Sequence, residues 1–339
     1  MRPRAPARGR GKLSTMSTAF PPSRLVETNG IKLEVHEAGE GPVVLLLHGF
    51  PELAYSWRNQ IAPIVDAGFR VVAPNQRGFG GSDAPADAQT YSVKNLVADI
   101  TGLLDALDVD AAIWVGHDWG SMPAWYAGAY APDRVLGAAS LCTPYFTPGE
   151  TDLIEAYDEL RGPKHYMATF QEPGVGEAML ERDVDGTFRA LIRGRGYTLE
   201  QFRSSPPEIQ EVPAGVFVGD PQLFGEELLS DEERAVYVEA YSRTGFTGGL
   251  NWYRALHKDW EEGLGHDFRY DKPALMICAA DDWFLPPDFT EGMEELLPQL
   301  EKHVIPDAAH WLQQEKPAEV NELLVPWLVR NFARQPAAA

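Results

Sequence analysis

The spacing of apolar and polar positions changes along the chain, and each change predicts an element. Residues 24–35 alternate around Asn29-Gly30, which predicts two antiparallel strands joined by a two-residue turn. Continuous aliphatic runs are typical of strands buried on both faces, and they lie at 42–47, 69–73, 111–115 and 135–142. Segments with helical spacing separate them, at 56–66, at 92–107 with Ser92 as the expected N-cap, and from the 116–120 motif to about 130. This alternation predicts an α/β fold: a mostly parallel sheet with helices on both faces.

The alternation stops after Pro144. The next hundred residues are rich in aromatic, Pro, Gly and acidic residues, with no strand pair and with helices expected at 151–160, 176–192 and 230–243. Sheet spacing then returns, with strands at 274–279 and 302–305 and helices at 288–297 and 317–332. We therefore expect an α/β core made of 24–144 and 255–335, and a helical cap made of 145–254.

Charge and cysteine content narrow the classes of partner. The chain has 29 Lys and Arg against 50 Asp and Glu, a net charge of −21, which repels nucleic-acid phosphates and anionic lipid. No apolar stretch reaches membrane-spanning length, so we expect neither a nucleic-acid nor a membrane partner. The protein is expected to be a monomer or a homodimer. The two cysteines, Cys142 and Cys278, lie in apolar runs and predict buried reduced thiols in the cytoplasm. Without Cys/His spacing for a metal, we expect no metal and no cofactor.

The N-terminus differs from the rest of the chain. Residues 1–12 hold five basic residues and are followed by no apolar signal region, so 1–23 is expected to be a disordered basic tail. Met16 offers an alternative start, which would leave residues 1–15 out of the native protein.

The segment Gly116-His117-Asp118-Trp119-Gly120 follows a buried strand and precedes a helix. This is the layout of a nucleophile elbow, G-x-nucleophile-x-G, with Asp118 at its apex. A carboxylate that attacks an ester or amide would form a high-energy anhydride. A carboxylate that attacks a saturated carbon forms an alkyl ester, which water can cleave at the carbonyl. An aspartate at this position therefore indicates cleavage of a carbon–oxygen or carbon–halogen bond.

Two further polar residues complete the order that is typical of the α/β-hydrolase fold, nucleophile, then acid, then histidine. His310 lies between the last strand and the last helix and is the expected general base. Asp281 and Asp282 both follow a strand and compete for the acid role. We choose Asp282, because Pro286 four residues later fits the strand-to-turn spacing of this fold.

The second step would create an oxyanion on Asp118, which needs hydrogen-bond donors. We expect the backbone amides of Trp119 and Phe50 to supply them, with a cis bond before Pro51. Opening an epoxide also needs a donor on the far side of the substrate from Asp118, and the helical insertion is its natural source. Its aromatic-rich stretches are 165–174 and 249–254, and a phenol there can donate a hydrogen bond while staying neutral.

From about residue 24 to 333 the chain resembles the soluble epoxide hydrolases of the α/β-hydrolase fold. The motifs that carry the resemblance are His48-Gly49-Phe50-Pro51-Glu52, the 116–120 elbow, Phe170-Gln171-Glu172-Pro173-Gly174, Asn251-Trp252-Tyr253-Arg254 and His310-Trp311. The resemblance implies that Tyr166 and Tyr253 hold the epoxide oxygen. Aromatic residues of the helical insertion, such as Phe170 and Phe217, indicate that the substrate is a small apolar epoxide, with water as the second reactant.

Several residues around these motifs are given other roles. We expect Phe50, Trp119, Phe170 and Trp311 to line the substrate pocket. His48, His117 and Arg77 are assigned to loop architecture. Asn75 stands where many relatives carry Asp, in a loop that is mainly structural.

Three other functions compete with conversion of an epoxide to a vicinal diol. A haloalkane dehalogenase would use the same Asp118–His310–Asp282 logic, but it often has Asn where this chain has Phe50 and needs no lid tyrosines. A fluoroacetate-type dehalogenase would carry Arg where this chain has Trp119. A non-catalytic ligand-binding protein would have lost a catalytic residue, and none is missing. We therefore expect an epoxide hydrolase that forms a covalent ester on Asp118.

Overall fold

The computed structural model describes residues 20–219 and 223–333. Eight strands form one sheet in the order β1-β2-β4-β3-β5-β6-β7-β8. β1 and β2 pair as a hairpin, β2 pairs antiparallel with β4, and all other neighbours are parallel. The strands are β1 (Ser23–Thr28), β2 (Ile31–Ala38), β3 (Val43–Leu47), β4 (Arg70–Asn75), β5 (Ala112–His117), β6 (Val135–Leu141), β7 (Ala274–Ala279) and β8 (Leu300–Ile305). The predicted α/β fold with a mostly parallel sheet is confirmed.

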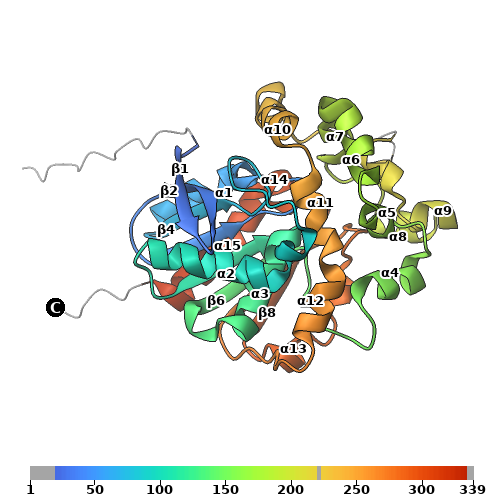
Figure 1. Cartoon of the computed structure of the whole chain (residues 1–339). Coiled ribbons are helices and arrows are strands. Elements are labelled where there is room, and N and C mark those ends of the chain that lie inside the picture. Colours follow the sequence, from blue (N-terminus) through green and yellow to red (C-terminus); the bar gives the residue numbers. More distant parts are fainter. Residues whose placement is uncertain (1–19, 220–222, 334–339) are drawn as a thin grey trace, which may run out of the picture.

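Helices cover both faces of the sheet, as Figure 1 shows. Alternate side chains of β3 point to opposite faces, so Leu45 and Leu47 belong to one apolar cluster and Val44 and Leu46 to the other. Helices α2 (Val93–Ala106) and α3 (Ser121–Tyr130) contribute to the first cluster. Helices α1 (Arg58–Asp66) and α15 (Pro317–Phe332) contribute to the second. Burial on both faces explains why the strand sequences are continuous aliphatic runs.

The segment 145–254 is helical, and its described residues include no strand. Figure 1 shows these helices gathered beyond one side of the sheet, together with α12 (Leu256–Gly263). They are α4 (Leu153–Arg161), α5 (Tyr166–Gln171), α6 (Val175–Leu180), α7 (Val184–Leu191), α8 (Leu199–Arg203), α9 (Pro207–Gln210), α10 (Asp231–Thr244) and α11 (Thr247–Arg254). The division of the chain into a core and a separate cap domain stays a prediction.

Two of the expected helices are interrupted. The helix expected at 176–192 is broken by a 3-10 turn, Glu181–Asp183, where the Asp183 side chain accepts a hydrogen bond from the Gly186 amide at 3.0 Å and starts α7. The helix expected at 288–297 becomes a 3-10 turn (Pro287–Thr290) and the short α13 (Met293–Leu296). Gly292 adopts a φ of 81° between them, which ends one element and begins the next.

The start of α2 also differs from the prediction. Ser92 occupies the N-cap position, but its hydroxyl makes no capping hydrogen bond. The Asp259 carboxylate of α12 takes over this function, because its Oδ1 accepts a hydrogen bond from the Val93 amide at 2.6 Å. A residue 166 positions away in sequence therefore caps this helix.

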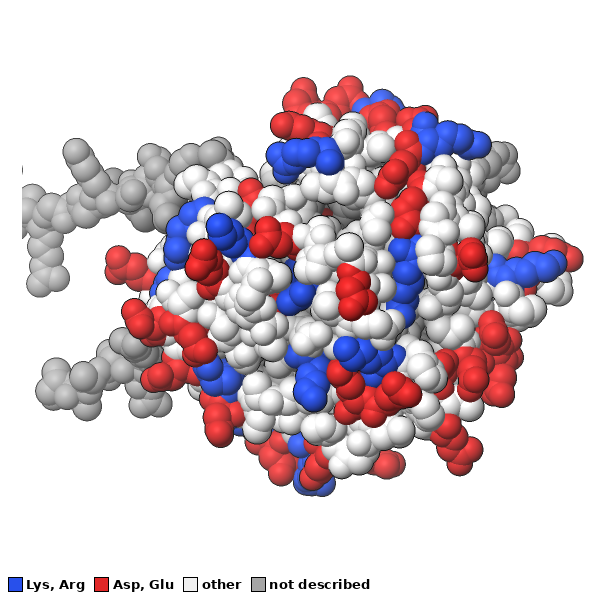
Figure 2. Space-filling view, viewed as in Figure 1, with Lys and Arg blue, Asp and Glu red and all other residues white. Residues whose placement is uncertain are grey.

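Residues 1–19 of the expected N-terminal tail lie outside the described residues, and the rest of it is ordered against the core. The Phe20 ring lies 4.7 Å from that of His36, and Ser23 already begins β1. No helix in the described part of the chain is long and apolar enough to cross a membrane. Cys142 and Cys278 are buried and unpaired. Acidic side chains, interspersed with Lys and Arg, spread over the face shown in Figure 2.

Candidate active site

Asp118 lies immediately after β5, at the carboxyl ends of the parallel strands, and before α3. Its φ of 50° is a left-handed conformation that only a tight, well-supported turn maintains. The flanking glycines make the turn possible: a Cβ on Gly116 would lie 2.4 Å from the Gly120 carbonyl oxygen, and one on Gly120 would lie 2.1 Å from that of Leu47. The fold thus holds the Asp118 side chain at the edge of the sheet where ligands of α/β proteins bind.

His310 lies between Asp118 and Asp282. Its Nε2 is 3.4 Å from Asp118 Oδ2, and its Nδ1–H donates to Asp282 Oδ2 at 2.8 Å. The amides of Phe284 and Leu285 donate to Asp282 Oδ1 at 2.9 and 3.0 Å, which fixes the carboxylate. The expected nucleophile, base and acid are therefore within contact of one another.

Asp281, the competing acid, points elsewhere. Its Oδ1 accepts a hydrogen bond from the Leu199 amide at 2.9 Å, and its Oδ2 pairs with Arg195 at 2.5 Å. Both partners belong to the helical segment 145–254. Asp281 thus ties this segment to the sheet, and Asp282 is the residue that reaches His310.

The charge of His310 depends on the two carboxylates beside it. Burial alone would lower the pKa of His310, but Asp282 and Asp118 outweigh burial and raise it to about 10. The ring is therefore an imidazolium at neutral pH as long as both carboxylates are ionised. Neutralising either one would remove a large part of the stabilisation of that charge.

Of the two expected amide donors, one already contacts the nucleophile. The Phe50 amide donates to Asp118 Oδ1 at 2.8 Å, and the Phe50–Pro51 bond is cis as expected. No hydrogen bond from the Trp119 amide to the Asp118 carboxylate forms among the described residues. The role of Trp119 as a second donor stays a prediction.

Tyr166 opens α5 and Tyr253 lies in α11, and their rings meet edge to face at 5.8 Å. Both side chains line the cavities that Asp118 also lines. The Tyr166 hydroxyl makes no hydrogen bond within the described part of the chain. The Tyr253 hydroxyl has the Trp119 side chain as a partner, and because an indole N–H only donates, the Tyr253 O–H is still available to a ligand. Burial raises the pKa of Tyr166 and of Tyr253 well above 10, and nearby Asp118 adds to both shifts. Both phenols therefore stay neutral donors at any working pH.

Two small cavities, of about 50 and 20 Å³, adjoin Asp118. Phe50 and Trp311 line the smaller one, and Trp119 lines the larger one. Phe170, which was also expected to touch substrate, lines neither cavity. It is fully buried behind the two tyrosines, 5.7 Å from the ring of Tyr166 and 5.2 Å from that of Tyr253.

Sequence reasoning missed part of the wall of the larger cavity. The missed side chains are Met122, Thr143, Phe146, Leu153, Tyr157, Met167 and Leu285. The helical spacing around 151–160 indicated that α4 has an apolar face, but it did not indicate that this face meets the nucleophile.

A buried ion pair supports the loop that carries His310. His117 Nδ1 is 2.7 Å from Glu52 Oε2, and its Nε2 is 2.8 Å from the His310 carbonyl oxygen. Because both partners are acceptors, both ring nitrogens carry protons and the ring is positive. Glu52 accepts further hydrogen bonds from the Gly49 amide and from the side chains of Gln313 and Gln314. His117 thus has the structural role expected from its sequence position.

The same region contains one group of residues with metal-ligating atoms close together among those described. It consists of His117, Cys142 and His310, whose ligand atoms lie within 4.8 Å of one another. Cys142 Sγ donates to the His310 carbonyl oxygen at 3.2 Å, and the ring nitrogens of His117 and His310 Nδ1 have the partners described above. These atoms are occupied by protein groups, so the cluster does not fit a metal ion.

Comparisons with known proteins agree on one family. The family described as alpha/beta hydrolase fold matches residues 42–174 and 192–317. The chain is 39% identical to epoxide hydrolase A of Mycobacterium tuberculosis, over 91% of this chain and 97% of that protein. It is 38% identical to bifunctional epoxide hydrolase 2 of Sus scrofa over 91% of this chain, and it spans 55% of the length of the pig protein. The crystal structure of epoxide hydrolase A from Mycobacterium thermoresistibile has a TM-score of 0.83 and 39% identity, covering 93% of this chain and 100% of that one.

Proposed function

Because the chain belongs to the epoxide hydrolases of the α/β-hydrolase fold, we propose that it converts an apolar epoxide to a vicinal diol through a covalent ester on Asp118. The observation that carries this mechanism is one cavity lined by the Asp118 carboxylate and by two phenols, Tyr166 and Tyr253. A carboxylate can attack the epoxide carbon while the phenols receive the oxygen that leaves it.

In the first step Asp118 Oδ2 attacks a carbon of the epoxide. The bond between that carbon and the epoxide oxygen breaks, and the oxygen takes hydrogen bonds and a proton from the two tyrosines. Oδ2 is the attacking atom because Oδ1 is held by the Phe50 amide. Oδ1 then becomes the carbonyl oxygen of the ester and stays in the position where the oxyanion develops.

In the second step His310 removes a proton from a water molecule, and the hydroxide attacks the ester carbonyl. Formation of the ester cancels the negative charge of Asp118, which is one of the two groups that raise the pKa of His310. The pKa of His310 then falls toward its ordinary value, and the ring passes its proton to the tyrosinate that the first step left, so that it can act as a base. The tetrahedral oxyanion is held by the Phe50 amide, with Trp119 as the second donor. When the oxyanion collapses, the bond between the carbonyl carbon and the alkyl oxygen breaks, and that oxygen takes the proton from His310 to complete the diol. The acid that remains on Asp118 then returns its proton to His310, which restores the starting carboxylate and imidazolium.

We further infer that the substrate is a small neutral molecule and that the enzyme works in the cytoplasm without a nucleic-acid or membrane partner. The net charge of −21 supports exclusion of polyanions and anionic lipid. Two buried, unpaired cysteines support a reducing compartment.

The covalent mechanism is tested by His310→Gln. Glutamine cannot act as the base, so the ester on Asp118 should form and persist. Mass spectrometry after mixing with styrene oxide should find the mass of the epoxide added to the peptide that contains residue 118.

The matched control is His303→Gln, because His303 is a half-exposed histidine on the edge strand β8. This variant should turn over styrene oxide normally and should accumulate no adduct. An unmodified residue-118 peptide in His310→Gln, with substrate bound, would contradict the covalent mechanism.

A further inference from the structure

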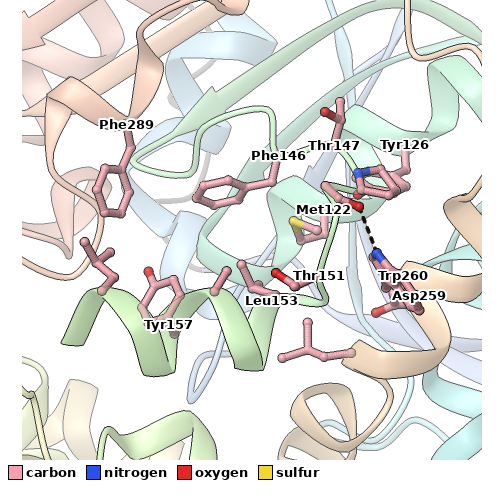
Figure 3. A pocket seen from close by; sticks show the side chains of 15 residues that line it. Met122, Tyr126, Phe146, Thr147, Thr151, Leu153, Tyr157, Asp259, Trp260 and Phe289 are labelled. Atoms are coloured by element: carbon pink, nitrogen blue, oxygen red, sulfur yellow. Dashed lines mark hydrogen bonds between the residues drawn. The ribbon is translucent and has the colours of Figure 1, made fainter. Parts of the chain in front are cut away.

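The long helical segment meets the triad in two places. In the first, the apolar face of α4, drawn in Figure 3, lines the cavity beside the nucleophile. In the second, Gly194 lines a space of about 10 Å³ together with Asp282 in the acid loop (280–285) and His310 in the base loop (306–311). This second contact places the helical segment directly against the two loops that must cooperate in hydrolysis of the ester.

Arg195 lies in the second contact and bridges the acid loop and the base loop. Its Nε pairs with Asp281 Oδ2 at 2.5 Å, directly before Asp282 in the chain. Its Nη1 pairs with Asp307 Oδ1 at 3.0 Å, three residues before His310. The guanidinium is planar and its charge is delocalised, so it can face two carboxylates at once. One side chain of the helical segment therefore connects both loops.

The backbone around Arg195 is attached to the base loop independently of its side chain. Glu315 Oε1 accepts a hydrogen bond from the Arg195 amide, and Glu315 Oε2 accepts one from the Ala309 amide, both at 2.7 Å. Ala309 is the residue before the base. A substitution of the Arg195 side chain therefore leaves this attachment of the helical segment in place.

A close contact between two stretches of chain supports Arg195. The Gly194 amide donates to the Glu226 carbonyl oxygen at 2.9 Å, and the Gly225 amide donates to the Gly194 carbonyl oxygen at 2.8 Å. A Cβ on Gly225 would lie 2.2 Å from the Arg195 carbonyl oxygen, so the two stretches can approach this closely only with glycine there. The guanidinium is thus held on a firm support, which a residue that positions others requires.

The two ion pairs of Arg195 differ in their exposure to water. The side chains of Arg195 and Asp281 are 31% and 13% exposed, whereas that of Asp307 is 71% exposed. Because water screens an exposed pair, the contact with Asp281 is the stronger of the two. Without the guanidinium, the poorly solvated Asp281 carboxylate would have to turn toward water, and the acid loop would shift with it.

We propose that Arg195 is a positioning residue for the second half of the reaction, in which it fixes the acid loop against the base loop so that Asp282 orients His310. This inference rests on the proposed epoxide hydrolase function. Opening of the epoxide depends on Asp118 and the two tyrosines instead. Loss of the Arg195 side chain should therefore slow hydrolysis of the ester and leave formation of the ester unchanged.

Arg195→Met tests this, because methionine keeps much of the side-chain length and removes the charge. The enzyme is mixed rapidly with styrene oxide and quenched with acid at successive times. Mass spectrometry of the residue-118 peptide then gives the rates at which the ester forms and decays. Decay should slow at least tenfold, since a displacement of about 1 Å can cost on the order of 100-fold, and formation should stay within about twofold of the wild type.

Arg203→Met is the matched control. Arg203 also joins the helical segment to the core, through an ion pair with Asp288 at 2.6 Å, but its partner adjoins neither Asp282 nor His310 in the chain. Both rates should stay at the wild-type values in this variant. A merely structural role of Arg195 predicts a lower melting temperature with equal changes in the two rates.

Arg195→Lys restores a positive charge that can pair with Asp281, so it should recover most of the decay rate. Asp281→Asn should be milder than Arg195→Met, because asparagine still offers Arg195 an accepting oxygen. If Arg195→Met does not fold, Glu315→Gln decides, because it places an amide N–H donor where a carboxylate oxygen accepted. This variant should also slow decay selectively.

Equal decay rates in the wild type and in Arg195→Met, or in Glu315→Gln where that variant decides, would overturn the proposal. A parallel slowing of ester formation and ester decay would do the same. Wild-type enzyme that forms no ester on Asp118 would instead refute the covalent mechanism itself.

Discussion

Replacing Glu52 by glutamine tests the buried ion pair that supports the His310 loop. The Glu52 side chain is fully buried and contacts His117 at 2.7 Å. Burial would raise the pKa of Glu52, but His117 and the Gly49 amide outweigh burial and lower it to about 2. Glutamine has the shape of the protonated acid, so Glu52→Gln measures what ionisation of this group contributes to folding.

The expected magnitude follows from the pKa. The difference between 4.5 and about 2 corresponds to about 3 kcal/mol, since each pKa unit is about 1.36 kcal/mol. Because the folded-state pKa is the lower one, this stabilisation is complete above about pH 4.5 and is lost as the pH falls through 2. At pH 7 the free energy of unfolding of Glu52→Gln should therefore be about 3 kcal/mol below that of the wild type, and at pH 3 the gap should narrow to about 1 kcal/mol.

The assay is urea unfolding of both proteins at the two pH values. The matched control is Glu301→Gln, which removes an ion pair with Arg330 at 2.7 Å on the exposed surface. That change should cost no more than about 0.5 kcal/mol at pH 7. A gap for Glu52→Gln below about 1 kcal/mol at pH 7, or the same gap at both pH values, would refute the assignment of a buried ion pair.

Two further predictions concern the reaction. Tyr166→Phe combined with Tyr253→Phe removes both phenolic donors, so kcat/KM for styrene oxide should fall by on the order of 10⁴-fold while the melting temperature stays unchanged. Near-normal turnover would exclude the tyrosines as donors to the epoxide oxygen. Asp282→Asn should slow hydrolysis of the ester by roughly 10³–10⁴-fold, because the His310 ring loses the partner that orients it, whereas Asp281→Asn should change the hydrolysis rate only a few fold. Comparable rate losses for the two variants in rapid-quench measurements would contradict the choice of Asp282 as the acid.

The sheet and the triad could be predicted because their sequence signals are local. A strand buried on both faces is a continuous apolar run, and the residue after such a strand lies at the edge where ligands bind. Asp118, Asp282 and His310 all follow β-strands, so their meeting within contact distance could be expected from position alone. The position of Pro286 alone favoured Asp282 over Asp281, and the structure shows that the two carboxylates bind different partners.

The helical segment was harder to predict, because contacts distant in sequence determine its details. Helical spacing from 176 to 192 gave no sign that the Asp183 side chain interrupts the helix and starts a new one. Aromatic content indicated a substrate pocket, but only the structure distinguishes Tyr166, which lines it, from Phe170, which lies behind it. Asp259 could not be read from sequence as the cap of α2, because its partner Val93 is 166 residues away.

Glu52 and Asp259 show how the number of donors, rather than burial, decides the role of a buried carboxyl group. Burial raises the pKa of both groups, yet the pKa of Glu52 ends near 2 and that of Asp259 well above 3.8. Glu52 accepts hydrogen bonds at both oxygens and faces a positive ring, so its charge is compensated and nothing remains to offer a ligand. Asp259 has one amide donor at Oδ1 and no bonded cation among the described residues, so burial prevails and raises its pKa. The first arrangement stabilises the loop that carries His310, and the second caps α2.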